Sequence, residues 1–263
     1  MEYQDIIYKK ENHTATIMIN RPEQYNAFRA QTCEEMIYAF KDADADRDIG
    51  VVVLTGAGDK AFCTGGDQSS HDGGYGGYGG RGVIGLPIEE VQSAIRDISK
   101  PVIARVNGYA IGGGNVLVTI CDLAIASENA QLGQAGPRVG SVDPGFGTAL
   151  LSRVVGEKKA REIWYLCRRY KAQEALAMGL VNAVVPQAEL DQEVQKWCDE
   201  INMMSPTAIA LAKKSFNVDS EMIRGMGGLA MHALKLYYET AESAEGGNAF
   251  REKRQPDFRK HQA

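Results

Sequence analysis

Short apolar runs of strand length alternate with helical stretches through the first half of this chain. The run at 51–55 is continuous and apolar, which is typical of a buried strand, and 102–106 and 123–126 also read as strands. Between them, 88–98 and 113–120 read as helices. Alternation of this kind constrains the fold more than any other feature, because strands and helices in turn favour an α/β layered architecture.

Both ends of the chain depart from this alternation. Residues 6–8 and 14–19 predict a hairpin-like pair of strands, and 31–43 predicts a helix. After residue 156 the pattern becomes mainly helical. The elements expected there are a strand at 181–185 and helices at 190–203, 207–216 and 222–241. We therefore expect a core over 1–200 and a helical region over 201–263 that packs on the core or on a neighbouring subunit.

Composition excludes several classes of protein. The formal net charge of the 263 residues is −5, which disfavours binding to nucleic acid or to an anionic membrane. The first ten residues carry no secretion signal, and no apolar run approaches the roughly 20 residues that span a bilayer. Five cysteines without a CxxC pair suit neither a disulfide framework nor a zinc site. We expect a soluble cytoplasmic protein without a metal.

Two glycine-containing segments, 61–68 and 107–115, each follow a predicted strand. Glycine lets the backbone approach a ligand closely, and the second segment opens a helix, whose N-terminus favours negative charge. Either segment by itself reads more simply as a tight turn. Together, they resemble the two halves of a backbone oxyanion hole, which stabilises the charge that develops on a thioester carbonyl.

A third glycine-rich segment, 72–82, contains a formal GxGxxG match at Gly74, Gly76 and Gly79. No predicted strand precedes the match and no helix opens within it, so a dinucleotide site is not expected. Its glycine content instead predicts a loop that is mobile without ligand.

Several linked motifs in order identify the chain as a member of the enoyl-CoA hydratase/isomerase, or crotonase, superfamily. The motifs are Arg21-Pro22-Glu23, Asn26-Ala27, Ala61-Phe62-Cys63-Thr64-Gly65-Gly66-Asp67, Lys100-Pro101-Val102-Ile103-Ala104, Gly108-Tyr109-Ala110-Ile111-Gly112-Gly113-Gly114 and Cys121-Asp122-Leu123. The resemblance implies an α/β spiral core of ββα turns and a C-terminal helical trimerisation region. It also implies an acyl-CoA substrate, oxyanion amides from Gly66 and Gly113, and a homotrimer or a dimer of trimers.

Departures from the hydratase pattern narrow the reaction. Hydratases carry two glutamates as acid and base, but this chain has Val116 and Gly136 at those places, and neither moves protons. Segments 141–145 and 233–238 are most similar to the 2-ketocyclohexanecarboxyl-CoA hydrolases, which open a ring to give pimeloyl-CoA. The 1,4-dihydroxy-2-naphthoyl-CoA synthases come next, although Tyr25 replaces the arginine with which they contact CoA phosphates.

The same resemblance suggests catalytic roles. Asp143 would position or activate water, Tyr238 would donate a proton or hydrogen bond, and Ser141 would orient Asp143 or the substrate. Gly136 would leave room for water or a bicarbonate, with no permanently bound cofactor. Simpler readings stay open: Asp143 as a turn residue before Pro144, and Tyr238 as a core residue.

Contacts to substrate or CoA are implied for a wider set. They are Ala27, Ala61, Thr64, Gly65, Asp67, Gln68, Tyr78, Tyr109, Gly112, Gly136 and Lys253. Lys253 reads equally well as part of a solvated basic tail. His71 has a suitable intrinsic pKa for proton transfer but reads more simply as structural or exposed. A further alternative is a catalytically idle fold that only binds acyl-CoA, since fold does not fix function.

Overall fold

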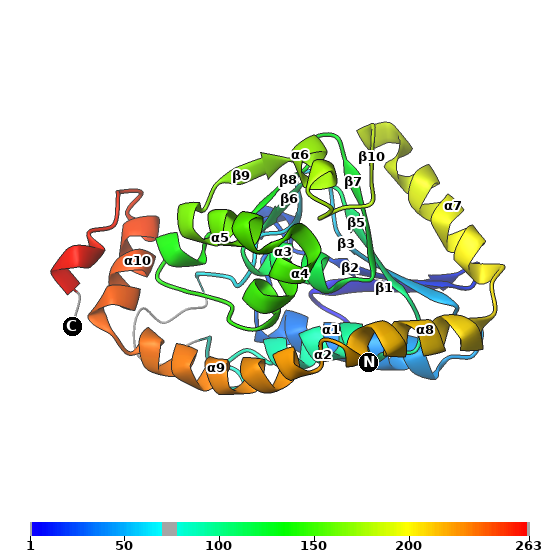
Figure 1. The fold of residues 1–263 in the computed structure, drawn as a ribbon, viewed down its shortest axis with the longest axis horizontal. Helices are drawn as coiled ribbons and strands as arrows, with labels where there is room; N and C mark the ends of the chain where they lie inside the picture. Colours follow the sequence, from blue (N-terminus) through cyan, green and yellow to red (C-terminus); the bar gives the residue numbers. More distant parts are fainter. Residues whose placement is uncertain (1, 70–77, 262–263) are drawn as a thin grey trace.

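The computed structural model describes residues 2–69 and 78–261, and its strands form two sheets (Figure 1). The larger sheet has the order β1 (Ile6–Glu11), β2 (Thr14–Ile19), β3 (Val51–Gly56), β5 (Val102–Val106), β7 (Leu123–Ser127) and β10 (Ala183–Val185). The smaller sheet has the order β4 (Ala61–Cys63), β6 (Tyr109–Ile111), β8 (Gln131–Gly133) and β9 (Arg169–Lys171). The pairs β1–β2 and β8–β9 are antiparallel, and the other neighbours are parallel.

Successive strands pass from the larger sheet to the smaller one. β3 leads to β4 and then to α2 (Ile88–Asp97), and β5 leads to β6 and then to α3 (Gly113–Ile120). β7 leads in the same way to β8. Each repeat therefore adds one strand to each sheet, which confirms the predicted α/β spiral of ββα turns.

The sequence did not predict the smaller sheet. Each of its strands has three residues, too few for an alternating pattern to be recognised. The helix predicted at 222–241 is confirmed as α9 (Met222–Tyr238), and a further helix, α10 (Ala241–Arg251), was not predicted. The Thr240 hydroxyl caps α10 by accepting a hydrogen bond from the amide of Ser243. α10 was missed because Gly246 and Gly247 lower its intrinsic helix propensity.

Both faces of the larger sheet are covered, which explains the apolar run of β3, whose six residues are all buried. One face packs on α7 (Leu190–Asn202), where Val53 and Ile103 meet Leu190. The remaining helices are α1 (Ala30–Ala45), α4 (Leu151–Val155), α5 (Glu157–Leu166), α6 (Ala172–Ala177) and α8 (Pro206–Val218). All five cysteines are buried. Among the described residues, no helix combines the length and apolarity that crossing a bilayer requires.

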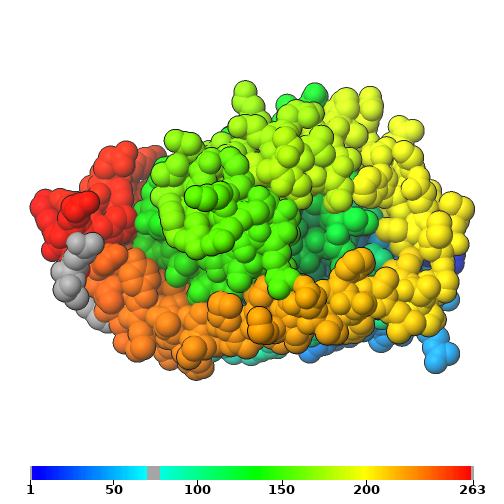
Figure 2. All heavy atoms as spheres, viewed as in Figure 1, coloured from blue at the N-terminus to red at the C-terminus, as the bar shows by residue number. Residues whose placement is uncertain are grey.

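α8 and α9 lie along the lower edge of the molecule in Figures 1 and 2. Both contact α2: the Asn217 side chain donates to the Arg96 carbonyl at 2.8 Å, and Arg224 pairs with Asp97 at 2.6 Å. A buried lysine fastens α8 there: Lys213 is 5% exposed, and its ammonium donates to the carbonyl oxygens of Ile95 and Lys100, each at 2.8 Å. The same ammonium forms an ion pair with Asp122 at 2.7 Å. α9 also contributes Met231 to the main hydrophobic core. The predicted boundary between a core (1–200) and a C-terminal helical region (201–263) stays a prediction.

Replacement of this lysine tests the fastening. We expect Lys213→Met to lower the free energy of unfolding by about 3 kcal/mol, because the Asp122 carboxylate and two carbonyls lose their shared partner. Urea denaturation followed by circular dichroism measures the change. Lys214→Met is the matched control, since Lys214 makes one exposed hydrogen bond, to Asp97. Equal effects of the two substitutions would contradict this account of α8.

Candidate active site

The two glycine segments meet at the end of the smaller sheet. β4 and β6 are parallel neighbours, so the chain leaves both strands at the same edge. A Cβ on Gly65 would lie 3.0 Å from the amide nitrogen of Gly113, and a Cβ on Gly113 would lie 3.1 Å from the Cα of Gly65. Gly65 also has a φ of +89°, which other residues rarely adopt. Glycine is therefore what allows the two backbones to approach.

The amides of Gly66 and Gly113 are not used in backbone pairing. Phe28 bonds to the neighbours of Gly66: its amide donates to the Gly65 carbonyl at 2.8 Å, and its carbonyl accepts from the Asp67 amide at 2.9 Å. Gly113 is the first residue of α3, where amides have no acceptor within the helix. Within 2–69 and 78–261, neither amide donates a hydrogen bond to the chain.

Both glycines line one cavity, whose empty volume of about 500 Å³ includes space open to solvent. Its apolar walls come from Phe28, Ile84, Leu86, Ile88, Val142, Trp164, Met231 and Leu234. Its polar lining includes Tyr78, Gln134, Ser141, Asp143 and Tyr238. All five residues predicted to be catalytic therefore line the same cavity, together with Gly112, Gly136 and Tyr78 of the predicted binding set.

Asp143 presents its carboxyl group to this cavity. Burial raises the pKa of Asp143 to about 6. Two hydrogen bonds to the charged carboxylate act in the opposite direction but are outweighed. The Gly147 amide donates to Oδ1 at 3.1 Å, and the Gln92 side chain donates to Oδ2 at 2.9 Å. A Cβ on Gly147 would lie 2.7 Å from that of Asp143, so glycine is required there. A carboxyl with this pKa can exchange protons near neutral pH.

Hydroxyl groups form a connected chain beside the aspartate. Tyr238 lies at the end of α9, and its Oη is 2.7 Å from Oγ of Ser141. Tyr238 is also hydrogen-bonded to Tyr78, whose Oη accepts from the Gln68 amide group at 3.1 Å. Burial raises the pKa of Tyr238 to about 12. Tyr238 is therefore a neutral hydrogen-bond donor at physiological pH, and core packing alone does not describe it.

Gln134 is a lining residue that the sequence analysis missed. It is 3% exposed, and its Nε2 has no hydrogen-bond partner among the described residues. A buried donor without a partner is costly, so a ligand or water is its expected acceptor. Beside it, a Cβ on Gly136 would lie 2.6 Å from the Ser141 carbonyl oxygen. The space where a side chain on Gly136 would lie is therefore filled by the protein. The space expected for water or bicarbonate is instead the cavity that Gly136 lines.

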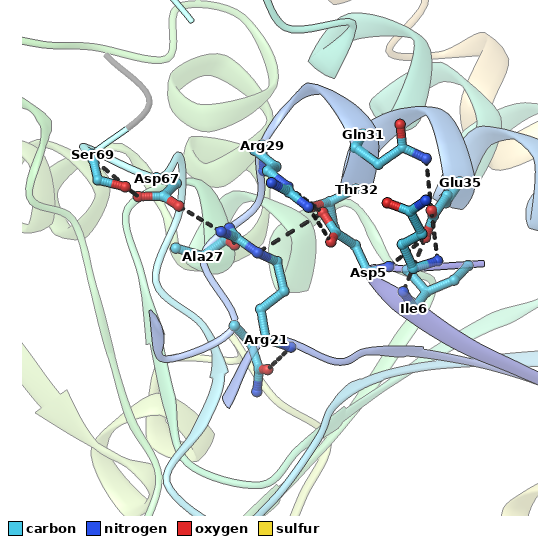
Figure 3. Close-up of polar contacts among 12 residues, drawn as sticks. Asp5, Ile6, Arg21, Ala27, Arg29, Gln31, Thr32, Glu35, Asp67 and Ser69 are labelled. Atoms are coloured by element: carbon cyan, nitrogen blue, oxygen red, sulfur yellow. Dashed lines mark hydrogen bonds and ion pairs between the residues drawn. The ribbon is translucent and has the colours of Figure 1, made fainter. Parts of the chain in front are cut away.

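A network of charged residues surrounds Asp67, which belongs to the first glycine segment (Figure 3). Asp67 is buried; Arg21 donates to its Oδ2 at 2.7 Å, and the Ser69 hydroxyl donates to its Oδ1 at 2.6 Å. Burial alone would raise the pKa of Asp67, but the contacts with Ser69 and Arg21 outweigh it and the pKa is lowered. Both carboxylate oxygens are occupied, so Asp67 supports the loop next to Gly66 instead of facing the cavity. Arg29, paired to Asp5 at 2.8 Å, extends this network.

The other predicted CoA contacts lie outside the cavity lining. Ala27 and Ala61 are buried, and the Ala61 carbonyl accepts from Asn26 at 2.7 Å. Thr64 donates to the Tyr25 carbonyl at 3.3 Å, and the rings of Tyr25 and Tyr109 are 6.3 Å apart. Lys253 is exposed after α10. The mutual contacts of Thr64, Tyr25 and Tyr109 form a surface group beside the glycine segments, and their role in CoA binding stays a prediction.

Two predicted features, His71 and the glycine-rich segment 72–82, lie wholly or partly outside the described residues. Gly74 and Gly76 are among the residues of this segment that are not described. Among the residues that are described, no group of three or more His, Cys, Asp or Glu side chains could hold a metal ion.

Comparison with known proteins agrees with this geometry. The family model described as enoyl-CoA hydratase/isomerase matches residues 9–261. An enoyl-CoA hydratase structure from Mycobacterium avium subsp. paratuberculosis is 28% identical with a TM-score of 0.86, covering 97% of this chain and 99% of that one. An enoyl-CoA hydratase from Bacillus anthracis is 32% identical with a TM-score of 0.74, covering 97% and 98%. A carnitinyl-CoA hydratase from Mycobacterium avium is 27% identical with a TM-score of 0.84, again covering 97% and 98%.

The hydrogen bond from Gln92 can be tested through the pKa of Asp143. We expect Gln92→Leu to raise that pKa above its value of about 6 by roughly one unit or more, because a hydrogen bond to the charged form contributes about 1.5–3 kcal/mol. A carbon-13 NMR titration of labelled aspartate carboxyls measures it, with Asp143→Asn to assign the signal. Gln195→Leu, on the exposed side of α7, is the control. An unchanged titration in Gln92→Leu would show that Gln92 does not hold the carboxylate.

Proposed function

The chain belongs to the enoyl-CoA hydratase/isomerase family, and from that premise we propose that it opens the ring of 2-oxocyclohexane-1-carbonyl-CoA by hydrolysis to give pimeloyl-CoA. It is a crotonase-family enzyme that acts on acyl-CoA thioesters. The specific reaction is our proposal, and one observation carries it. A single cavity is lined by two backbone amides that donate to no described residue and by a carboxyl group whose pKa is raised to about 6.

The proposed chemistry divides between these groups. Asp143 accepts a proton from water as the oxygen adds to the ring ketone. The adduct then collapses to a carboxylic acid, and the bond between the ketone carbon and the carbon bearing the thioester breaks. The electron pair of that bond passes into the thioester enolate. The amides of Gly66 and Gly113 donate to the enolate oxygen, where the charge develops, and each such donor is typically worth about 3 kcal/mol.

The enolate carbon then takes up the proton that Asp143 removed from water, directly or through Tyr238, which completes the addition of one water molecule and restores both side chains. Tyr238 is suited to this step or to a hydrogen bond with a substrate oxygen, because it is neutral at physiological pH and lines the cavity. Its contact with Ser141 at 2.7 Å fixes the direction of its hydroxyl. We propose Ser141 as the residue that positions Tyr238.

Simple hydration of an enoyl-CoA is disfavoured by the residues at the two hydratase glutamate positions. Val116 is 1% exposed and has no titratable group, and Gly136 has no side chain. Asp143 is then the titratable carboxyl that lines the cavity among the described residues. A single carboxyl suits a reaction in which one base activates water and the oxyanion amides hold the product enolate.

A bicarbonate, which some related synthases use as a base, fits the polar side of this cavity. The unpartnered Nε2 of Gln134 is a suitable donor to a carbonate oxygen, and Gly136 lines the cavity next to it. Bound there, bicarbonate would supply a further proton acceptor. The same donor would serve a water molecule equally well, so we propose Gln134 as the residue that holds either one.

A second candidate function is ring closure, as in the 1,4-dihydroxy-2-naphthoyl-CoA synthases. The observation in its favour is Tyr78, which matches a substrate-contacting tyrosine of those enzymes, lines the cavity and is hydrogen-bonded to Tyr238. Against it stands Tyr25 in place of their phosphate-binding arginine, and we propose that Lys253 takes over part of that contact. We place ring opening first for this reason.

The C-terminal helices also present an apolar surface that supports the proposed trimer. Its exposed side chains are Leu211, Phe216, Val218, Met222, Met226, Leu229 and Leu236 on α8 and α9. A surface of this kind on a water-exposed edge is typical of a subunit interface. We propose that copies of this chain meet along these helices.

Turnover tests the reaction directly. We expect purified protein to convert 2-oxocyclohexane-1-carbonyl-CoA to pimeloyl-CoA, with oxygen-18 from labelled water in the new carboxylate, as mass spectrometry would detect. Asp143→Asn should lower kcat by at least a hundredfold, with binding of pimeloyl-CoA nearly unchanged, because general-base catalysis contributes about 10²–10⁴-fold. No ring opening but closure of o-succinylbenzoyl-CoA would identify a synthase. No turnover of either substrate would favour a binding module.

The pH dependence follows from the pKa of Asp143. Since the reaction uses the carboxylate and its pKa is raised to about 6, kcat/KM should be constant near pH 8 and fall as the pH drops through about 6. Initial rates over pH 4.5–8.5 measure the profile. A rate that declines near pH 4, the ordinary carboxyl range, would argue against Asp143 as the base.

A further inference from the structure

A second cavity adjoins the first on the side of α10. It is small, opens to solvent, and is lined in part by Tyr78, Ser141 and Tyr238, which also line the first cavity. Its other described lining residues are Gln68, Val139, Gly140, Ser243, Ala244, Gly247 and Arg251. The hydroxyl-bearing residues therefore border both spaces.

Arg251 gives this cavity its charge. No other charged side chain lines it among the described residues. The guanidinium lies close to Gly247, because a Cβ there would be 3.5 Å from Nη1, and Nη2 donates to the Asn248 side chain at 2.6 Å. No described carboxylate pairs with Arg251, whereas Arg254 is paired with Glu245. Arg251 is exposed and thus presents to this cavity a positive charge that no described carboxylate neutralises.

The position of α10 relative to the catalytic hydroxyls is fixed by close backbone contact. A Cβ on Gly246 would lie 2.3 Å from the amide nitrogen of Gly140, and a Cβ on Gly140 would lie 2.3 Å from the Ser243 carbonyl oxygen. The Ser243 hydroxyl donates to the Gly140 carbonyl at 2.7 Å. Since Gly140 precedes Ser141, Arg251 and the Ser141–Tyr238 pair are held as parts of one assembly.

We propose that this second cavity binds the carboxylate at the far end of an acyl chain whose thioester lies at Gly66 and Gly113. The ligand class is the CoA monothioesters of dicarboxylic acids, and guanidinium is the side chain best suited to a carboxylate. The inference rests on the proposed function, because ring opening converts the ketone carbon into a carboxylate at the opposite end of the chain from the thioester. Arg251 would then hold the product's new charge.

Binding measurements test this without turnover. Isothermal titration calorimetry would compare pimeloyl-CoA with heptanoyl-CoA, which has the same chain length and no distal carboxylate. We expect wild-type protein to prefer pimeloyl-CoA by about tenfold, and Arg251→Gln to remove most of that preference with little effect on heptanoyl-CoA. Arg251→Lys should retain part of it. Arg47→Gln, an exposed site with the same change of charge, should retain all of it.

Thermal melts of each variant check that the fold is intact. Equal affinity of wild-type protein for the two thioesters, or a preference that survives Arg251→Gln, overturns the carboxylate site and leaves the ring-opening assay to be judged separately. Failure of wild-type protein to bind either thioester overturns the acyl-CoA premise and the carboxylate site together. Ring opening without a binding preference overturns only the assignment of Arg251.

Discussion

The close approach of two backbones at Gly65 and Gly113 is the constraint on which the rest of the site depends. It arises because β4 and β6 are short parallel neighbours, so both chains leave the smaller sheet at one edge. Any side chain on either glycine would meet backbone atoms at about 3 Å. The backbone of Phe28 forms its hydrogen bonds with Gly65 and Asp67, so the amide of Gly66 is available to a ligand. The close packing of these two backbone segments is therefore what brings the amides of Gly66 and Gly113 to one cavity.

The cavity that these amides line also contains a buried carboxyl group, Asp143, whose charged form is unfavourable there. Burial disfavours the Asp143 carboxylate, so its ionisation destabilises the folded state above pH 6, and this cost disappears as the pH falls below the ordinary carboxyl range. The hydrogen bonds from Gln92 and Gly147 limit the cost and set the direction of the carboxyl group. What accompanies this loss of stability is a carboxyl group that can exchange protons near neutral pH.

The C-terminal helices complete the site as well as covering it. Lys213 fastens α8 to the core, which sets the path of α9, and α9 ends at Tyr238 beside Ser141. α10 then returns against Gly140 and brings Arg251 to the second cavity. The region that the sequence presents as an appendage thus supplies Tyr238 and Arg251 to the cavities, while the segments that follow β4 and β6 of the smaller sheet supply Gly66 and Gly113.

The sequence by itself determined the α/β layering, the family, and the residues Gly66, Gly113, Asp143, Ser141 and Tyr238 as members of one site, because motif order and strand-to-helix alternation are local properties of the chain. It could not reveal the three-residue strands of the smaller sheet, whose pairing depends on neighbours from other repeats. Nor could it reveal Gln92, Gln134 or Arg251, since a glutamine or arginine on a helix or loop acquires a role only from what tertiary packing places opposite it. Tertiary structure also decided that Asp67 supports a loop and that Asp143 has a raised pKa, because burial and hydrogen-bond partners are set by contacts between residues far apart in the chain.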